Sequence, residues 1–134
     1  MANFDHIVTT LRAAAEPTRL RILRLVQNCE FTVKDLTQLL GQSQPRVSRH
    51  IRLLAEAGLV ERYQEGSWVF VRTASDPAAK SFVSAALAMI PEGDPQTVRD
   101  DERAELVRAS RAIAAQAYFD ANAAQWDRIR ALHV

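Results

Sequence analysis

Apolar residues recur every three or four positions along the first part of the chain, which is the spacing of one face of an α-helix. The spacing predicts four helices, at residues 4–15, 17–29, 32–41 and 43–57. Pro17 is expected to open the second helix, because proline is tolerated in the first turn. Thr32, followed three residues later by Asp35, approximates a capping box for the third helix. Gly41 is expected to end that helix and Ser43 to cap the fourth, so only a tight turn separates the two.

The turn at residues 41–43 joins two helices as in a helix-turn-helix motif, whose second helix enters the major groove of DNA. Val47, Ile51 and Leu54 form the predicted buried stripe of the helix at 43–57. At about 100° per residue, the opposite face is polar apart from one proline. That face holds Pro45, Ser48, Arg49 and Arg52, flanked by Gln44 and Arg46. Because arginine, glutamine and serine bond phosphates and base edges, this face predicts binding to double-stranded DNA.

Two short runs after Gly58 predict a β-hairpin. Residues 59–63 and 68–72 are rich in β-branched and aromatic side chains, and a polar segment at 64–67 separates them. A hairpin directly after the DNA-entering helix is a wing, and its glycine tip can approach the DNA backbone or minor groove. We expect Arg62 and the tip residue Ser67 to hold the backbone there. An ordinary core hairpin fits the same pattern and does not conflict with this interpretation.

The remainder of the chain is also predicted to be helical. Residues 76–90 give a fifth helix that is too apolar to stand alone, and the proline-flanked linker 91–95 leads into an alanine-rich helical segment at 96–133. We therefore expect a winged helix-turn-helix domain at 1–90 and a C-terminal helical extension at 96–134. The expected fold class is mainly α with a β-hairpin wing. Because the first and fifth helices are more apolar than a winged core can cover, we expect a homodimer.

The net charge of +1 conceals an uneven distribution. Residues 1–75 carry ten Lys and Arg against seven Asp and Glu, whereas residues 76–134 carry seven against nine. The run 44–52 contains three arginines, a histidine and no acid, and such a focused positive patch attracts phosphates. A protein-interaction module would have no need of it. The candidate DNA-binding residues are Gln44, Arg46, Ser48, Arg49, His50, Arg52, Arg62 and Ser67. For His50, a phosphate contact and a packing role between helices both stay open.

Composition argues against several other classes of protein. No apolar stretch approaches the ~18 residues of a membrane span, and the first residues lack a signal-peptide pattern, so we expect a cytoplasmic protein with no membrane partner. Cys29 is the single cysteine, which excludes an internal disulfide, and its place on the stripe of the second helix predicts a small buried hydrophobic residue. The glycines lack the spacing of a nucleotide-binding loop. We assign no catalytic residue, no cofactor and no enzyme activity.

Three sequence segments resemble the ArsR family of bacterial repressors, and the resemblance spans roughly residues 5–90. The segments are Glu16-Pro17-Thr18-Arg19-Leu20-Arg21-Ile22-Leu23, Ser43-Gln44-Pro45-Arg46-Val47-Ser48-Arg49-His50-Ile51-Arg52-Leu53-Leu54 and Ala57-Gly58-Leu59-Val60. The resemblance implies a winged-helix fold that dimerises through the first and fifth helices and represses transcription from a palindromic operator. It also implies that a metal, a redox change or a small molecule relieves the repression.

The chain departs from the metal-sensing members of this family. Their cysteine pair lies at the start of the third helix, where this sequence has Thr32 and Lys34 in the stretch 30–36. A lysine ammonium repels cations, and no thiolate or imidazole in this stretch can bind a soft metal. The family's second metal site uses Asp and His on the fifth helix, whereas no histidine lies within residues 76–90. We therefore expect no metal site and a signal of another kind, such as a small-molecule inducer.

The tail bears a second resemblance. Residues 117–127 look like the lead-in to a methyltransferase domain in regulators that are fused to one. This leaves an alternative in which the chain is the N-terminal regulatory portion of a fusion to an S-adenosylmethionine-dependent methyltransferase. The other interpretation is an amphipathic helix that extends the dimer interface, and it requires no further domain.

Overall fold

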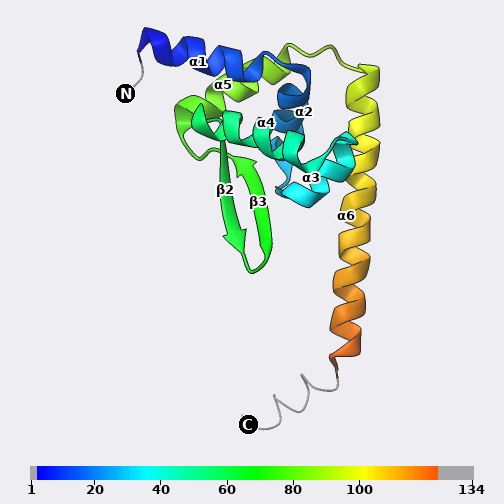
Figure 1. Cartoon of the computed structure of the whole chain (residues 1–134). Helices are drawn as coiled ribbons and strands as arrows, with labels where there is room; N and C mark the ends of the chain where they lie inside the picture. Colours follow the sequence, from blue (N-terminus) through cyan, green and yellow to red (C-terminus); the bar gives the residue numbers. More distant parts are fainter. Residues whose placement is uncertain (1–2, 124–134) are drawn as a thin grey trace.

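Six helices and three strands make up the part of the chain that the computed structural model describes, residues 3–123 (Figure 1). The helices are α1 (Phe4–Ala14), α2 (Pro17–Asn28), α3 (Val33–Leu40), α4 (Gln44–Glu56), α5 (Pro77–Ala88) and α6 (Pro95–Ala121). The strands are β1 (Phe31–Thr32), β2 (Val60–Glu65) and β3 (Trp68–Thr73). The helix order and the hairpin that directly follows α4 confirm the expected winged helix-turn-helix fold.

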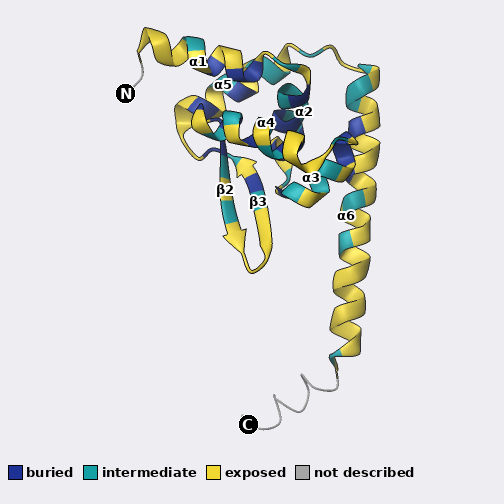
Figure 2. Cartoon of the chain, viewed as in Figure 1, coloured by how far each residue is buried: buried dark blue, intermediate teal, exposed yellow. Residues whose placement is uncertain are grey.

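The hydrophobic core lies where α2, α3 and α4 meet the sheet. Ile22 of α2, Leu36 of α3 and Ile51 of α4 are almost fully buried, and Phe31 and Val71 bring the strands against them. The whole predicted stripe of α4 is buried in this core, while the opposite side of the helix is largely exposed (Figure 2). Burial of one face therefore fixes the direction in which the polar face of α4 points.

The sheet is antiparallel, in the order β1-β3-β2. β2 runs further toward the tip than the sequence predicted, because Glu65 pairs with Trp68 and leaves a two-residue turn in place of a four-residue loop. Gly66 has a φ of +62°, a left-handed conformation that glycine adopts without a steric penalty. The strand β1 was not predicted. It pairs Phe31 with Val71 of β3, which ties the start of α3 to the wing.

The helix ends follow the predicted local chemistry at some positions and not at others. Thr32 and Asp35 form a full capping box, with reciprocal bonds of 3.0 and 2.9 Å, and Gly41 ends α3 in a left-handed conformation. Ser43 occupies the N-cap of α4, but its side chain makes no capping hydrogen bond. The placement of Cys29 on the second helix was wrong. Cys29 lies just beyond the end of α2, in extended backbone, half-buried against the core.

The first part of α6 packs against the winged body. It contacts α2 and α3, and Figure 1 shows it beside them. Arg21 and Arg24 of α2 form two-pronged ion pairs with Asp100 and Asp101. Further along, Arg111 approaches Asp35 at 3.3 Å. This half of the helix is therefore part of one folded unit with α2 and α3.

The second part of α6 extends away from the body. Residues 112–121 are all exposed, and in Figure 2 the ribbon of this stretch has the colour of exposed residues. The predicted helix at 96–133 is confirmed as far as Ala121, and residues 124–134 lie outside the described part of the chain. The division into a domain at 1–90, a linker and an extension stays a prediction.

Candidate nucleic-acid interface

The outward face of α4 carries the basic residues that the sequence singled out. Arg46, Arg49 and Arg52 are exposed, as is Gln44 in the first turn, and Ser48 is half-buried among them. The only acid on the helix is Glu56 in the last turn, 3.8 Å from Arg52 in an exposed i,i+4 pair. Such pairs contribute little energy, so the arginines stay available to an anionic partner.

The helix-turn-helix turn is fastened to α2. The Gln42 side-chain amide donates to the Thr18 hydroxyl at 2.9 Å, and Thr18 is buried in the first turn of α2. Within residues 3–123, the Gln42 Oε1 atom is buried without a hydrogen-bond partner. The bond to Thr18 fixes the turn that leads into α4, so it sets where the first residues of that helix lie.

His50 lies against α2, in a polar cluster with Glu16, which precedes that helix, and Arg19, which lies in its first turn. Its Nδ1 atom is 3.2 Å from the Arg19 guanidinium and 3.7 Å from the Glu16 carboxylate. Arg19 donates again to the carbonyl of Ala13, at 2.6 Å. His50 thus joins the back of α4 to the junction of α1 and α2. Of the two roles that the sequence left open, this geometry favours packing between helices.

The ionisation of His50 follows from this cluster. Burial lowers its pKa below the ordinary value, and the nearby positive charges of Arg19, Arg46 and Arg49 lower it further. The Glu16 carboxylate opposes them. An Arg19 donor on Nδ1 requires that nitrogen to be the acceptor, which is the neutral imidazole. The neutral form is therefore the one that this packing stabilises.

The wing tip, the start of α3 and the start of α4 surround one hollow of about 370 Å³. Gln44 and the tip residue Ser67 both line it, so the structure brings together two residues predicted from separate segments. It adds two that sequence reasoning missed, Lys34 and Trp68. The Lys34 ammonium lies 5.8 Å from the centre of the exposed Trp68 ring. The sequence signal that could have found Lys34 is the position of this lysine in the first turn of α3, the first helix of the helix-turn-helix.

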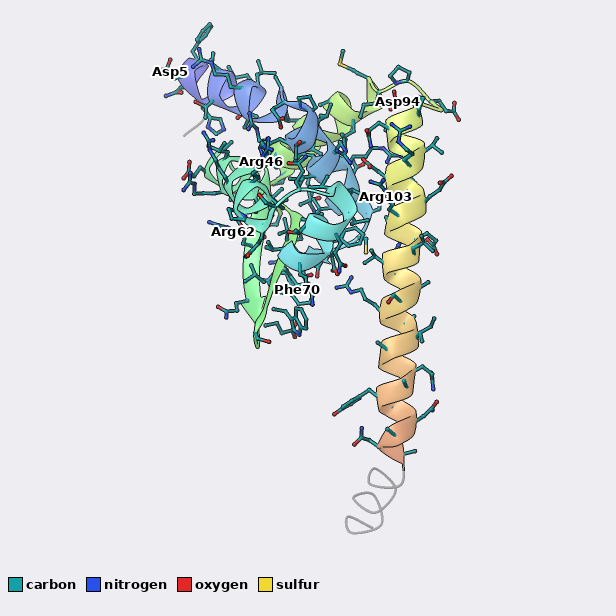
Figure 3. All side chains as sticks on the ribbon, turned by 45° about the vertical axis from the view of Figure 1, so that its right-hand side comes forward. Asp5, Arg46, Arg62, Phe70, Asp94 and Arg103 are labelled. Atoms are coloured by element: carbon teal, nitrogen blue, oxygen red, sulfur yellow. The ribbon has the colours of Figure 1, made fainter. Side chains whose placement is uncertain are left out.

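Arg62 stands apart from the wing tip. It is exposed and pairs with Val71 in the ladder, toward the α4 end of the hairpin. Figure 3 shows Arg62 and Arg46 in the winged body, to the left of α6 in that view. The predicted site residues thus lie in three places. Gln44, Arg46, Ser48, Arg49, Arg52 and Ser67 lie around the outer face of α4 and the wing tip, Arg62 lies at the base of the wing, and His50 points toward α2.

A separate apolar surface lies on α1 and α5. Phe4 is 83% exposed and Ile7 43% exposed, although both are large apolar side chains. They line a mainly apolar hollow of about 830 Å³ together with Leu59 and Phe82. Exposed apolar patches of this kind mark protein interaction sites. The surface is where the sequence predicted dimerisation.

Within residues 3–123, no three His, Cys, Asp or Glu side chains gather where they could share a metal ion. None of the helices in the same stretch is long and apolar enough to cross a bilayer.

Comparisons with known proteins agree with this geometry. The family model described as "Bacterial regulatory protein, arsR family" matches residues 16–62, from the start of α2 into the wing. The arsenic resistance transcriptional regulator ArsR1 of Pseudomonas putida is 32% identical over 91 residues, which are 67% of this chain and 70% of that protein. This chain belongs to the ArsR family. The family model describes its members as bacterial regulatory proteins.

A further relative and a solved structure also resemble this chain. The arsenical resistance operon repressor of Escherichia coli K12 is 41% identical over 66 residues, which are 48% of this chain and 56% of that protein. Among solved structures, reduced HlyU from Vibrio cholerae N16961 superposes with a TM-score of 0.59 at 27% identity, and the match covers 66% of this chain and 92% of HlyU. The family match gives no support to the methyltransferase resemblance of residues 117–127.

Proposed function

We propose that this ArsR-family regulator represses transcription by gripping a palindromic DNA operator as a homodimer. The observation that carries the proposal is the outer face of α4, where Arg46, Arg49 and Arg52 are exposed on a helix held rigidly by its buried stripe. The E. coli and P. putida relatives carry the names of an operon repressor and a transcriptional regulator, which supports the same role here.

Within this interface, position along α4 suggests distinct roles. Gln44 and Ser48 lie near the N-terminal end of the helix, which reaches base edges in proteins of this motif. Arg49 and Arg52 are proposed as the main electrostatic contacts, with Arg46 beside them. The proposed backbone contacts are Arg62, Ser67 and Lys34. His50 supports the helix from behind through Arg19 and Glu16.

Dimerisation is proposed to occur through α1 and α5. Phe4, Ile7 and Leu11 expose one apolar face of α1, and Met89 at the end of α5 is 84% exposed. A second copy that covers this surface removes it from water and presents two α4 helices to one DNA. A two-fold dimer must then meet half-sites one helical turn apart, ~34 Å, in an inverted repeat.

The signal that releases the operator is proposed to be something other than a metal. The Thr32 hydroxyl is buried and already accepts the backbone N–H of Asp35, while Lys34 lies over Trp68. Both positions are thus occupied by structural contacts at the place where the family's metal sensors carry thiolates. A regulator that acts on bacterial DNA works in the cytoplasm, and we propose no catalytic role for any of its residues.

Selection of bound DNA from a random pool tests this proposal. The full chain should enrich an inverted repeat with half-site centres about one helical turn apart. A fluorescent duplex that carries the repeat should bind two protomers per site, and scrambling one half-site should strongly weaken the binding. Enrichment of no sequence, or of a single unrepeated half-site bound by one protomer, would contradict the proposal.

A further inference from the structure

A third hollow, of about 440 Å³, lies between α6 and the body of the protein, beside the stretch from Asp101 to Arg108. The end of α2, the strand β1, α5 and α6 all contribute to its wall. Its volume falls within the range of small-molecule sites, ~300–1,000 Å³. None of the α4 residues assigned to DNA lines it, so the proposed interface does not account for it.

The floor of this hollow is apolar, whereas most of its accessible lining is polar. Leu25 of α2, Phe31 of β1 and Ala104 of α6 are buried side chains that line it, and Leu87 of α5 adds a half-buried one. The first three are almost fully covered by the fold, so only a small apolar area is left to contact the carbon part of a small organic molecule.

The rim is polar and offers hydrogen-bond donors. Arg24 is already committed, since both of its outer nitrogens bind the Asp101 carboxylate at 2.6 and 2.9 Å. Among the described residues, Arg108 pairs with Glu105, one helical turn away at 3.3 Å, and that side chain is 73% exposed. Exposed pairs of this kind contribute little energy, so another carboxylate can replace Glu105. The Asn28 amide lines the same rim and is exposed.

We propose that this hollow binds a small organic carboxylate. Arg108 and the Asn28 amide hold the carboxylate group, and the apolar floor covers the hydrocarbon part. The one acid of the wall, Asp101, is neutralised by Arg24, which leaves the positive charge of Arg108 to select an anion over a cation.

The position of the hollow gives the ligand a route to the DNA interface, and this consequence rests on the proposed function. Within the stretch of α6 that lines the hollow, and just after it, the helix contacts both ends of α3. Arg103 donates to the carbonyl of Leu39 at 3.3 Å, and Arg111 pairs with Asp35 at 3.3 Å. A ligand wedged between α5 and α6 therefore acts on the helix that supports α4, and the bound carboxylate weakens operator binding.

Calorimetric titration of the full chain without DNA tests the site directly. Benzoate and hexanoate should bind saturably with a Kd of about 1 mM, as expected for ligands of this size. Benzamidine, which has the shape of benzoate and the opposite charge, should not bind. Arg108→Gln should weaken benzoate binding about tenfold, because a charge-assisted bond is lost. Arg99→Gln, on the same helix outside the hollow, is the matched control and should bind as the wild type does.

Two further measurements separate the outcomes. Thermal unfolding of Arg108→Gln should match that of Arg99→Gln, which shows that a loss of binding reflects the site. Equal binding of benzoate and benzamidine, unchanged binding by Arg108→Gln, or no saturable carboxylate binding would overturn the inference. Operator binding without benzoate is measured separately, so failure of the carboxylate site leaves the proposed DNA interface standing and the reverse also holds. Benzoate that binds but leaves operator affinity unchanged would overturn the regulatory step.

Discussion

Arg21 of α2 donates from two nitrogens to the two carboxylate oxygens of Asp100 on α6, each at 2.9 Å. Asp100 is only 3% exposed and also accepts the Gln96 side-chain amide, so its charge is fully engaged within the fold. The neighbouring pair of Arg24 with Asp101 has the same two-pronged geometry, yet Asp101 is 60% exposed. The two pairs join the same helices and differ mainly in burial.

Replacement of the buried aspartate should therefore cost far more than replacement of the exposed one. Asp100→Ala leaves Arg21 in a poorly hydrated place without its partner and should lower the free energy of unfolding by about 3 kcal/mol. Asp101→Ala, the matched control, should cost at most about 1 kcal/mol. Urea denaturation at fixed protein concentration measures both. Equal costs would mean that α6 is not anchored to the body through Asp100.

The capping geometry gives a second contrast. Thr32→Ala removes the hydroxyl that accepts the Asp35 N–H and should destabilise the protein by about 1 kcal/mol. Ser43 occupies the equivalent position of α4 but makes no side-chain capping bond, so Ser43→Ala should change stability by less than about 0.5 kcal/mol. Thermal unfolding without DNA compares the two variants. A large loss from Ser43→Ala would show that its hydroxyl caps α4 in solution.

Stability should fall in mild acid because of His50. The folded pKa of His50 lies below its ordinary value of 6.5, chiefly through burial, so the unfolded chain binds its proton at higher pH than the folded protein does. The stability that neutral His50 contributes is present above pH 6.5 and is lost as the pH falls through the lowered pKa. Urea denaturation at pH 7.5 and 5.5 should show a smaller loss for His50→Gln than for the wild type. The same loss in both proteins would contradict this account, and His6→Gln on α1 is the control.

The apolar face of α1 makes a prediction about assembly. Ile7→Glu places a charge on the surface proposed to meet a second copy and should yield monomers, because burial of an unpaired charge is costly. Leu106→Glu on α6 changes an even more exposed apolar residue and should leave the dimer intact. Sedimentation at micromolar concentration distinguishes the two. If Leu106→Glu dissociates the dimer and Ile7→Glu does not, the dimer interface lies on α6 and not on α1.

Much of the fold was predictable because its elements carry local signals. Periodic apolar residues mark the helices, and the Thr32 and Asp35 pair marks the start of α3. The strand β1 has only two residues, too few for an alternating pattern, and its extended form depends on pairing with Val71 of β3. Cys29 was misplaced for a related reason: the apolar stripe of α2 continues to it, whereas the chain has already turned toward β1.

The candidate site was predictable only in part. The exposed face of α4 followed from the angular position of Arg49 and Arg52 relative to the buried stripe. The contact of His50 with Arg19, and the approach of Lys34 to Trp68, join residues far apart in the chain. So does the pair of Arg21 with Asp100, 79 positions apart. Such pairs depend on how helices and strands meet in space, which no local pattern contains.

The central claim is that α4 is the helix that reads DNA. Affinity for the selected operator and for a scrambled duplex should be measured at several salt concentrations, for the wild type, Arg49→Ala, Arg52→Ala and the charge-matched control Arg99→Ala. Replacement of an arginine that contacts phosphate should weaken binding to both duplexes alike, and should lower the slope of log affinity against log salt concentration by ~1 per contact. Replacement of an arginine that reads a base should cost ~1–3 kcal/mol of binding free energy at a single operator position. Arg99→Ala should bind as the wild type does. If Arg49→Ala and Arg52→Ala both leave the two affinities unchanged, α4 is not the DNA-reading helix.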